Sequence, residues 1–342
     1  MERNYQQKLS IKKGTKIYLN LRKSLDDEGI LDRSYVYYFF LTSFELLMFG
    51  IFVAFVIISN SLWQTVLATI GMAFFTVRLG GIAHDAGHRA ILKSGLLNDV
   101  VGYIVCIPIV FPFKVWKLKH NAHHANPNDE AKDPDLQVPI SFSKEKFDRK
   151  DMLVRIIRKY QAYIFYFIGP LVSISMRVKS LGYYISNFKP RYAFELFYMI
   201  TGLIIMFVLP FVFFPLSKAI VYCLLFIFVS GFYMLNIFAP NHKGMPQLKD
   251  SSKFSFFEKQ VVTSRNVVGN FIYDYLYMGL NYQIEHHLFP NTPRYKLKRI
   301  VKYAKAECKK AGIPYTEMSA YESTKFILTQ LHIASKEFDE MG

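Results

Sequence analysis

The chain has 342 residues, of which 52% are hydrophobic and 20% charged, and it carries a formal net charge of +16. Its mean hydropathy is positive, and its apolar residues gather in runs of about twenty, the length that crosses a bilayer as a helix. This composition excludes an ordinary soluble globular protein. We attribute the positive charge to membrane topology and to anionic lipid headgroups, and we expect no nucleic-acid partner.

Four apolar runs are predicted to span the membrane, at residues 36–59, 62–79, 193–216 and 219–239. Almost nothing separates the first run from the second or the third from the fourth, so they form two helical hairpins. Of the 42 Lys and Arg residues, 8 precede residue 36, 18 lie from 78 to 191, and 15 follow residue 240. With four spans these residues share one side, and the positive-inside rule then places both termini in the cytoplasm.

Two weaker apolar stretches, residues 96–113 and 161–176, are interrupted by prolines, and the second contains the pair Gly169-Pro170. If both stretches crossed the bilayer, the 8 Lys and Arg residues between positions 114 and 150 would lie outside the cell. That arrangement violates the charge rule. We therefore expect both stretches to be interfacial or re-entrant segments.

The predicted organisation is one domain over residues 1–342, with an all-α integral membrane fold. A cytoplasmic N-terminal segment (1–35) and the first hairpin (36–79) are followed by a cytoplasmic region with the interfacial segments (80–192). The second hairpin (193–240) then leads to a cytoplasmic helical cap (241–342). Glu45 lies inside the first span, and we expect it to face a partner or a cavity, or to make a packing contact with Thr42 or another helix, because an unpaired carboxylate in a membrane helix is costly.

Histidine is concentrated in three short boxes, which hold seven of the nine histidines of the chain. The boxes read His84-Asp-Ala-Gly-His88, His120-Asn-Ala-His123-His124 and Gln283-Ile-Glu-His286-His287. Residues three or four apart share a helix face, so each box directs its imidazoles to one point. Imidazole is a common ligand of zinc, copper, iron and nickel. With His242 as an eighth ligand, the boxes predict a cytoplasmic site for two metals.

Five polar residues near these histidines are candidates to orient a ligand or to reach the metal directly or through water: Asp85, Asn236, Asn241, Gln283 and Glu285. Asp85 either holds an imidazole by a hydrogen bond, which fixes the tautomer, or is simply solvated. Asp133 and Asp135 either orient ligands, bind a substrate head group, or simply form a turn.

The position of the histidines above apolar helices indicates the chemistry. The natural substrate at such a place is an acyl chain. An unactivated methylene has no acidic proton and no leaving group, so acid–base or nucleophilic catalysis cannot attack it. Abstraction of a hydrogen atom by an oxidising metal centre can, and that chemistry belongs to the metal. The type of ligand alone does not identify the metal.

The three boxes, in this order and separation, resemble those of the membrane fatty acid desaturases. The stretch Gln283-Ile-Glu-His-His-Leu-Phe-Pro290 is similar to the front-end, acyl-lipid branch of that family. The resemblance implies an O2-dependent enzyme that introduces a cis double bond into a lipid-linked or CoA-linked fatty acyl chain. It also implies two non-haem irons held by His84, His88, His120, His123, His124, His242, His286 and His287. A di-iron membrane lipid hydroxylase or ketolase is the alternative.

Desaturation also requires two electrons from a donor. Many front-end members carry a fused cytochrome b5 domain with a His-Pro-Gly-Gly motif, which this sequence lacks. We therefore expect a separate donor: a ferredoxin, a flavodoxin, or cytochrome b5 with its reductase. The basic segment from Arg294 to Lys310 has an apolar face at helical spacing. It is predicted either to pack under the cap or to dock an acidic donor protein or an anionic acyl carrier.

Overall fold

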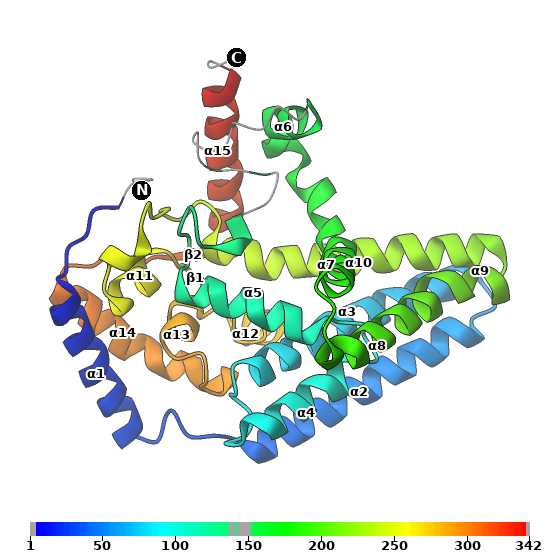
Figure 1. Ribbon diagram of the computed structural model, residues 1–342, viewed down its shortest axis with the longest axis horizontal. Helices are drawn as coiled ribbons and strands as arrows, with labels where there is room; N and C mark the ends of the chain where they lie inside the picture. Colours follow the sequence, from blue (N-terminus) through cyan, green and yellow to red (C-terminus); the bar gives the residue numbers. More distant parts are fainter. Residues whose placement is uncertain (1–4, 137–139, 141, 143–151, 340–342) are drawn as a thin grey trace. The chain divides into compact units, whose positions relative to one another are not determined.

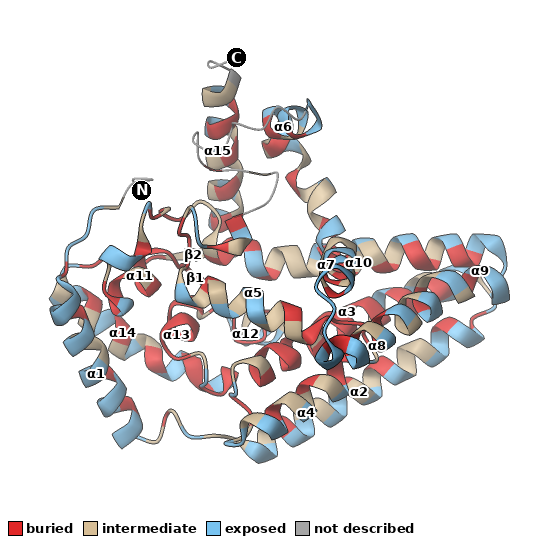
Figure 2. Ribbon diagram, viewed as in Figure 1, coloured by how far each residue is buried: buried red, intermediate tan, exposed pale blue. Residues whose placement is uncertain are grey.

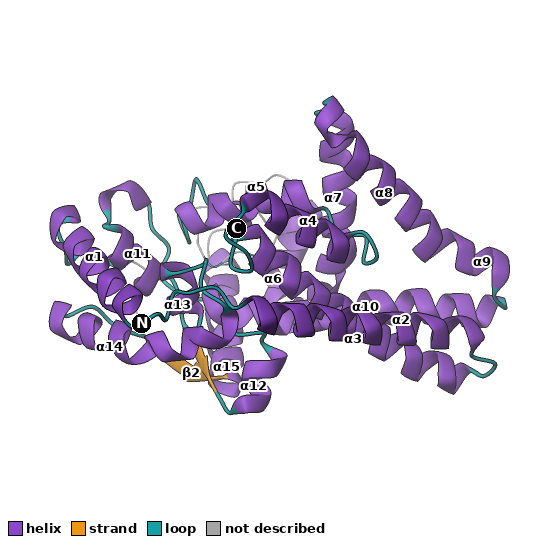
Figure 3. Ribbon diagram, turned by 90° about the horizontal axis from the view of Figure 1, so that it is seen from below, coloured by secondary structure: helices purple, strands orange, loops and turns teal. Residues whose placement is uncertain are grey.

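The computed structural model describes residues 5–136, 140, 142 and 152–339. The chain forms two compact units. Unit 1 consists of Met1–Asp32, Lys119–Phe167 and Asn236–Gly342, and unit 2 of Arg33–Leu118 and Ile168–Leu235. Helices dominate the described residues of both units (Figures 1 and 3).

Unit 2 contains the long apolar helices. Its elements are α2 (Tyr35–Ile58), α3 (Leu62–Gly87), α4 (Gly95–Cys106), α7 (Val172–Ser186), α8 (Ala193–Leu203), the π-helical segment Ile204–Val208, α9 (Leu209–Phe213) and most of α10 (Leu216–His242). Helix α5 (Phe113–Ala125) begins in unit 2 and ends in unit 1.

Helices α2 and α3 form the first hairpin and pack against each other. The backbone N–H of Ser61 donates to Gln64 Oε1 at 3.2 Å, which satisfies a donor at the start of α3. Large apolar side chains such as Phe39, Leu47 and Ile58 remain exposed on α2 (Figure 2). An exposed apolar surface of this extent is typical of a helix that faces lipid.

Among the described residues, five helices, rather than the four that we predicted, are long and apolar enough to cross a membrane. Four of them match the predicted runs: Tyr35–Ile58, Leu62–Gly87, Pro190–Phe213 and Leu216–His242. The fifth is Met152–Ser186, which contains the stretch that we expected to be interfacial. A 3-10 turn at Gly169–Leu171 interrupts it. The expected count of four spans is therefore not confirmed by length and composition. The other expected interfacial stretch contains only the shorter helix α4.

The carboxylate of Glu45 has a partner on the neighbouring helix. Arg78 Nε on α3 donates to Glu45 Oε1 at 2.6 Å, and both side chains are buried. Lys218 is the only Lys or Arg outside the three basic regions of the sequence. Its Nζ donates to the carbonyl oxygens of Ile57 and Ser59, at 3.1 and 2.8 Å, beside the C-terminal end of α2. A cation at this end of a helix is stabilised by the helix dipole.

Unit 1 is built from shorter helices and one small sheet. Its elements are α1 (Ile11–Asp27), α6 (Met152–Ile168, of which the last residue belongs to unit 2), α11 (Phe256–Val262), α12 (Phe271–Leu276), α13 (Gln283–Leu288), α14 (Leu297–Ala311), α15 (Ala320–Asp339), β1 (Asn266–Val268) and β2 (Glu317–Ser319).

The core of unit 1 lies between α1, α11, α13 and α14. Ile284 and Leu288 of α13 share one buried apolar cluster with Phe257 of α11 and Ile300 of α14. Helix α13 is buried along its whole length (Figure 2). The basic segment predicted to be helical is α14, which ends at Gly312 in the left-handed conformation (φ 68°).

Strands β1 and β2 pair in parallel, with Asn266 opposite Glu317, so the prediction of an all-α fold needs correction. The three-residue strands were too short to give an alternating pattern in the sequence.

Helices α6 and α15 contact each other through polar groups within unit 1. Gln161 Nε2 donates to the carbonyl oxygen of Leu331 at 3.3 Å, and Ser335 Oγ donates to the carbonyl oxygen of Arg158 at 3.0 Å. Gln161, Arg158 and Ser335 are buried, so this contact excludes water.

We predict that Arg78→Met lowers the free energy of unfolding by about 3 kcal/mol, because it leaves the Glu45 carboxylate buried without its partner. The double variant Glu45→Gln/Arg78→Met should recover most of that loss. Thermal unfolding of the purified protein in one detergent compares four chains: the unchanged protein, Arg78→Met, Glu45→Gln and the double variant. Losses that simply add would show that the two side chains do not stabilise each other.

Candidate metal centre

Unit 1 gathers six of the eight predicted histidine ligands. They come from α5, from the last residue of α10 and from α13, which are far apart in sequence: His120, His123, His124, His242, His286 and His287. The ring centroids of His123 and His287 lie 5.1 Å apart, those of His123 and His242 4.7 Å apart, and those of His124 and His287 4.2 Å apart. The second and third boxes and His242 therefore meet in one cluster.

The cluster has two parts. His123, His242 and His287 offer one ring nitrogen each, all within 4.8 Å of one another. In the other part, His124 Nε2 lies 3.1 Å from His120 Nε2 and 3.2 Å from His286 Nε2. Three imidazoles with converging nitrogens form the kind of donor set that holds a transition metal.

In the first part, the Nδ1 atom of each imidazole lies within hydrogen-bond distance of an oxygen atom. His123 Nδ1 lies 2.9 Å from Asp133 Oδ2, and His242 Nδ1 lies 3.0 Å from the carbonyl oxygen of Thr263. His287 Nδ1 lies 2.7 Å from Gln260 Oε1. Because these oxygens accept, each Nδ1 carries the proton and each Nε2 has the lone pair that a metal needs. In His242 this lone pair faces the amide nitrogen of Gln283. This arrangement fits a bound metal.

Gln260 and Thr263 were missed by the sequence analysis. Both lie at the C-terminal end of α11, which has no histidine and no ligand spacing that could have drawn attention to it. Gln260 Nε2 donates to the carbonyl oxygen of His124 at 2.8 Å, which turns its Oε1 toward His287. One amide thus connects the second box with the third.

Asp133 and His123 shift each other's protonation. Burial lowers the pKa of the His123 imidazole, but the hydrogen bond to Asp133 and the charges of Asp135 and Asp133 outweigh it and raise the pKa. Burial likewise raises the pKa of Asp133, yet the hydrogen bond and charge of His123 and backbone N–H groups lower it overall. Asp133 therefore remains an ionised acceptor. It contacts a candidate ligand, and it also accepts from the backbone N–H groups of Asn128 and Asp135, so it takes part in the turn as well.

Gln283 and Asn241 lie against His242. Gln283 Nε2 is 2.9 Å from His242 Nε2, and Gln283 Oε1 accepts from Asn241 Nδ2 at 3.0 Å. Asn241 Nδ2 also donates to the carbonyl oxygen of Ile237. These contacts bring Gln283 to the ligand atom of a candidate histidine. Asn236 is half-buried on α10, six residues before His242.

Glu285 lies in a different environment from the one that we expected. Its carboxylate accepts from Asn266 Nδ2 at 2.7 Å and from the Tyr315 hydroxyl at 2.6 Å. Within the described part of the chain it contacts no imidazole by a hydrogen bond. Burial raises the pKa of Glu285 to about 7, although these hydrogen bonds act in the opposite direction. Asn266 Oδ1 also accepts from the backbone N–H of Ile284, so this network fixes α13 to β1.

Unit 2 holds the first box at the C-terminal end of α3. The rings of His84 and His88 are 4.7 Å apart, and one nitrogen of each lies within 4.8 Å of the other. His84 Nδ1 is 3.3 Å from Asp85 Oδ1, and Asp85 Oδ2 accepts from the Tyr38 hydroxyl at 2.6 Å. Asp85 therefore contacts an imidazole and is itself held by α2.

A family model described as fatty acid desaturase matches residues 60–319. This range includes the eight histidines predicted to be ligands. The chain is 28% identical to an acyl-lipid (9-3)-desaturase of Physcomitrium patens over 89% of its own length and 60% of that protein.

Two further relatives are covered more fully. The chain is 26% identical to a Delta(8)-fatty-acid desaturase of Euglena gracilis over 93% of its own length and 78% of that protein. It is 27% identical to the Delta(6)-fatty-acid desaturase fat-3 of Caenorhabditis elegans, over 95% of its own length and 77% of that protein.

We predict that Gln260→Ala lowers the affinity for Fe(II) or Co(II) about ten- to a hundredfold, because His287 loses the acceptor that fixes its tautomer. Gln260→Glu keeps the acceptor for His287 but removes the donor to the His124 carbonyl oxygen, so it separates the two contacts of the amide. Competition with a chelator measures the affinity of both variants. Equal affinity of Gln260→Ala and the unchanged protein would remove this role of Gln260.

Proposed function

This chain belongs to the fatty acid desaturase family, a family of oxidoreductases that act on fatty acids, and we propose that it is a membrane-bound, O2-dependent fatty acyl desaturase. The proposed reaction removes two hydrogens from adjacent methylenes and leaves a cis double bond. It consumes one O2, two electrons and two protons, and releases two waters. The observation that carries the proposal is the imidazole cluster of unit 1, with three outer nitrogens held by oxygen atoms.

The proposed centre contains two non-haem irons. Its ligands are the six histidines of the cluster together with His84 and His88 of the first box. When bound, such irons supply the oxidising power that an unactivated methylene requires. Asp133, Thr263 and Gln260 keep three imidazoles in the tautomer that can bind a metal, and Asp85 does so for His84. Gln283 and Asn241 complete the surroundings of His242.

We further propose four membrane spans, with both termini and all the boxes on the cytoplasmic side. The contact between α6 and α15 supports this count. Helix α15 carries Glu322, Lys325, Lys336 and Glu337, and such a helix cannot lie in hydrocarbon beside α6 without a large cost. Helix α6 has three basic residues of its own and is followed by the turn at Gly169–Leu171.

Helix α6 then lies in the membrane interface. Large side chains at helical spacing remain exposed along one of its faces: Met152, Ile156, Tyr160, Tyr163 and Phe167. Arg155 and Lys159 flank this face. An exposed apolar stripe with flanking cations is the pattern of a helix at the boundary between headgroups and acyl chains.

The proposed substrate is a fatty acyl chain carried by a membrane lipid or by CoA. Relatives from Physcomitrium patens and Borago officinalis are named acyl-lipid desaturases, which favours the lipid-linked form. The two electrons are proposed to come from a ferredoxin or flavodoxin, or from cytochrome b5 with its reductase. A lipid hydroxylase or ketolase with the same ligands remains the second candidate, and the mass of the product separates the two.

We predict that His123→Ala and His286→Ala each reduce activity below detection and leave membrane insertion intact, because both remove a cluster imidazole that lies outside the spans. His332→Ala, at the one histidine that is not a candidate ligand, should retain full activity. Fatty-acid profiles by mass spectrometry, after expression with a compatible donor, measure the product. A new peak two mass units lighter identifies desaturation, and one sixteen units heavier identifies hydroxylation. Full activity of a folded box variant would refute its ligand role.

The four-span topology predicts where thiol reagents can react. In spheroplasts, a membrane-impermeant maleimide should label Asn60→Cys but neither Lys12→Cys nor Lys325→Cys, and it should label all three after permeabilisation. The native cysteines Cys106, Cys223 and Cys308 are buried, so the background is low. Labelling of only one of Lys12→Cys and Lys325→Cys in spheroplasts would instead mean an odd number of spans.

A further inference from the structure

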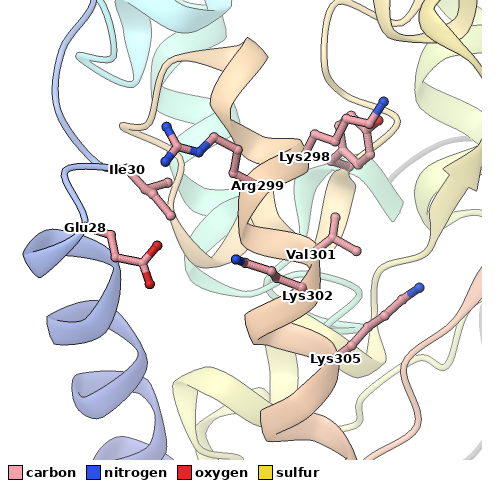
Figure 4. A pocket seen from close by; sticks show the side chains of 8 residues that line it. Glu28, Ile30, Lys298, Arg299, Val301, Lys302 and Lys305 are labelled. Carbon is pink, nitrogen blue, oxygen red and sulfur yellow. The ribbon is translucent and has the colours of Figure 1, made fainter.

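A hollow of about 560 Å³ opens on unit 1 along α14 (Figure 4). Four cations of this helix line it: Lys298, Arg299, Lys302 and Lys305. Glu28, which follows α1, and Tyr282, which directly precedes α13, also line the hollow. The hollow is thus strongly basic and carries a single acidic side chain.

The four cations differ in their partners. Lys298 Nζ lies 3.3 Å from Asp274 Oδ2, and Lys305 Nζ lies 2.7 Å from Glu317 Oε2. Arg299 and Lys302 form no salt bridge with any described residue, and both are exposed. They extend toward the side of α1, whereas Lys298 and Lys305 extend the other way (Figure 4). Two neighbouring positive charges in the hollow therefore lack a counter-charge from the described chain.

The single carboxylate in the wall is already engaged. The Tyr303 hydroxyl donates to the Glu28 carboxylate, and Lys302 Nζ lies over the Tyr303 ring, 4.6 Å from its centroid. The Glu28 carboxylate therefore accepts a hydrogen bond from a tyrosine and forms no salt bridge with Arg299 or Lys302. An anionic group from another molecule can therefore bind in the hollow and pair with Arg299 and Lys302.

The hollow is directly connected to the imidazole cluster. Tyr282 in its wall is bonded to Gln283, and Gln283 Nε2 is 2.9 Å from His242 Nε2. Helix α13, which carries His286 and His287, packs on α14 through Ile284 and Ile300. One short helix thus separates the basic surface from candidate metal ligands. A redox centre bound over the hollow would reach the cluster through few bonds.

We propose that this hollow docks acidic side chains of the electron-donor protein, an inference that rests on the proposed desaturase function. Arg299 and Lys302 would pair with its carboxylates. The arrangement favours a protein surface over one phosphate group. Lys298 and Lys305 have carboxylate partners in this chain and extend away from Arg299 and Lys302, so the four cations do not converge on one point. They are spread over seven residues, roughly 10 Å of helix, and an isolated phosphate would contact only part of this surface.

Charges at an exposed docking surface act mainly on the rate of association, and salt screens them. Reversal of Arg299 and Lys302 should therefore weaken the encounter with the donor and leave the reaction at the metal centre unchanged. The test compares Arg299→Glu/Lys302→Glu with Lys325→Glu/Lys336→Glu, which makes the same charge change on α15. All are full-length chains in the same membranes.

Activity is measured with two reductants: an acidic [2Fe–2S] ferredoxin with its reductase, and reduced methyl viologen, a small cation that needs no docking surface. In the Arg299/Lys302 variant we expect the KM for ferredoxin to rise about tenfold at low salt and to approach that of the unchanged protein at high salt. Its rate with methyl viologen, its iron content and the KM of the α15 control should stay unchanged.

Three results would overturn the docking proposal. An unchanged KM for ferredoxin removes the surface from donor binding. Equal loss with both reductants means that the substitutions damage the centre. A raised KM for the acyl substrate alone assigns the hollow to an anionic group of that substrate instead. If the unchanged protein forms no desaturated product with either reductant, the proposed function itself fails, which is a separate outcome.

Discussion

The hydrogen bonds between imidazole Nδ1 atoms and oxygen acceptors are the interactions on which the candidate metal centre depends. An imidazole can present Nε2 to a metal only if its other nitrogen has a place for its proton. Asp133, Thr263 and Gln260 supply that place for three rings. Two of these acceptors lie on or directly after α11, so the packing of α11 against α13 decides whether the nitrogens converge. The apolar contact of Phe257 with Ile284 and Leu288 is therefore part of the site.

A second constraint acts on the membrane hairpins, where lipid offers no hydrogen bonds to a polar group. In unit 2, polar side chains of the hairpins bind other groups of the same unit. Glu45 binds Arg78, and Lys218 binds carbonyl oxygens beside the end of α2. The cations of α14 are under no such constraint, because they lie at an exposed surface where water solvates them. The same residue types thus serve structure in one unit and are available for recognition in the other.

The apolar stretch at 152–186 shows how composition and packing can disagree. By hydropathy and length it is a candidate span. Its first half, however, buries Arg158 and Gln161 against a helix rich in charged residues. Hydropathy averages a window and does not register which face of a helix is apolar, whereas packing depends on that face. The proposed interfacial placement of α6 accounts for both observations.

The sequence by itself determined the four apolar runs, the three boxes, His242 and the helix at 297–311, because hydropathy and helical spacing are local properties of the chain. It also indicated the contacts of Asp85 and Asp133, which lie within ten residues of their imidazoles. Tertiary structure alone decided the partner of Glu45, the pairing of β1 with β2, and the turn of Glu285 toward Asn266 and Tyr315. It alone revealed Gln260 and Thr263, because their imidazole partners lie more than twenty residues away and no local pattern records a contact made by packing.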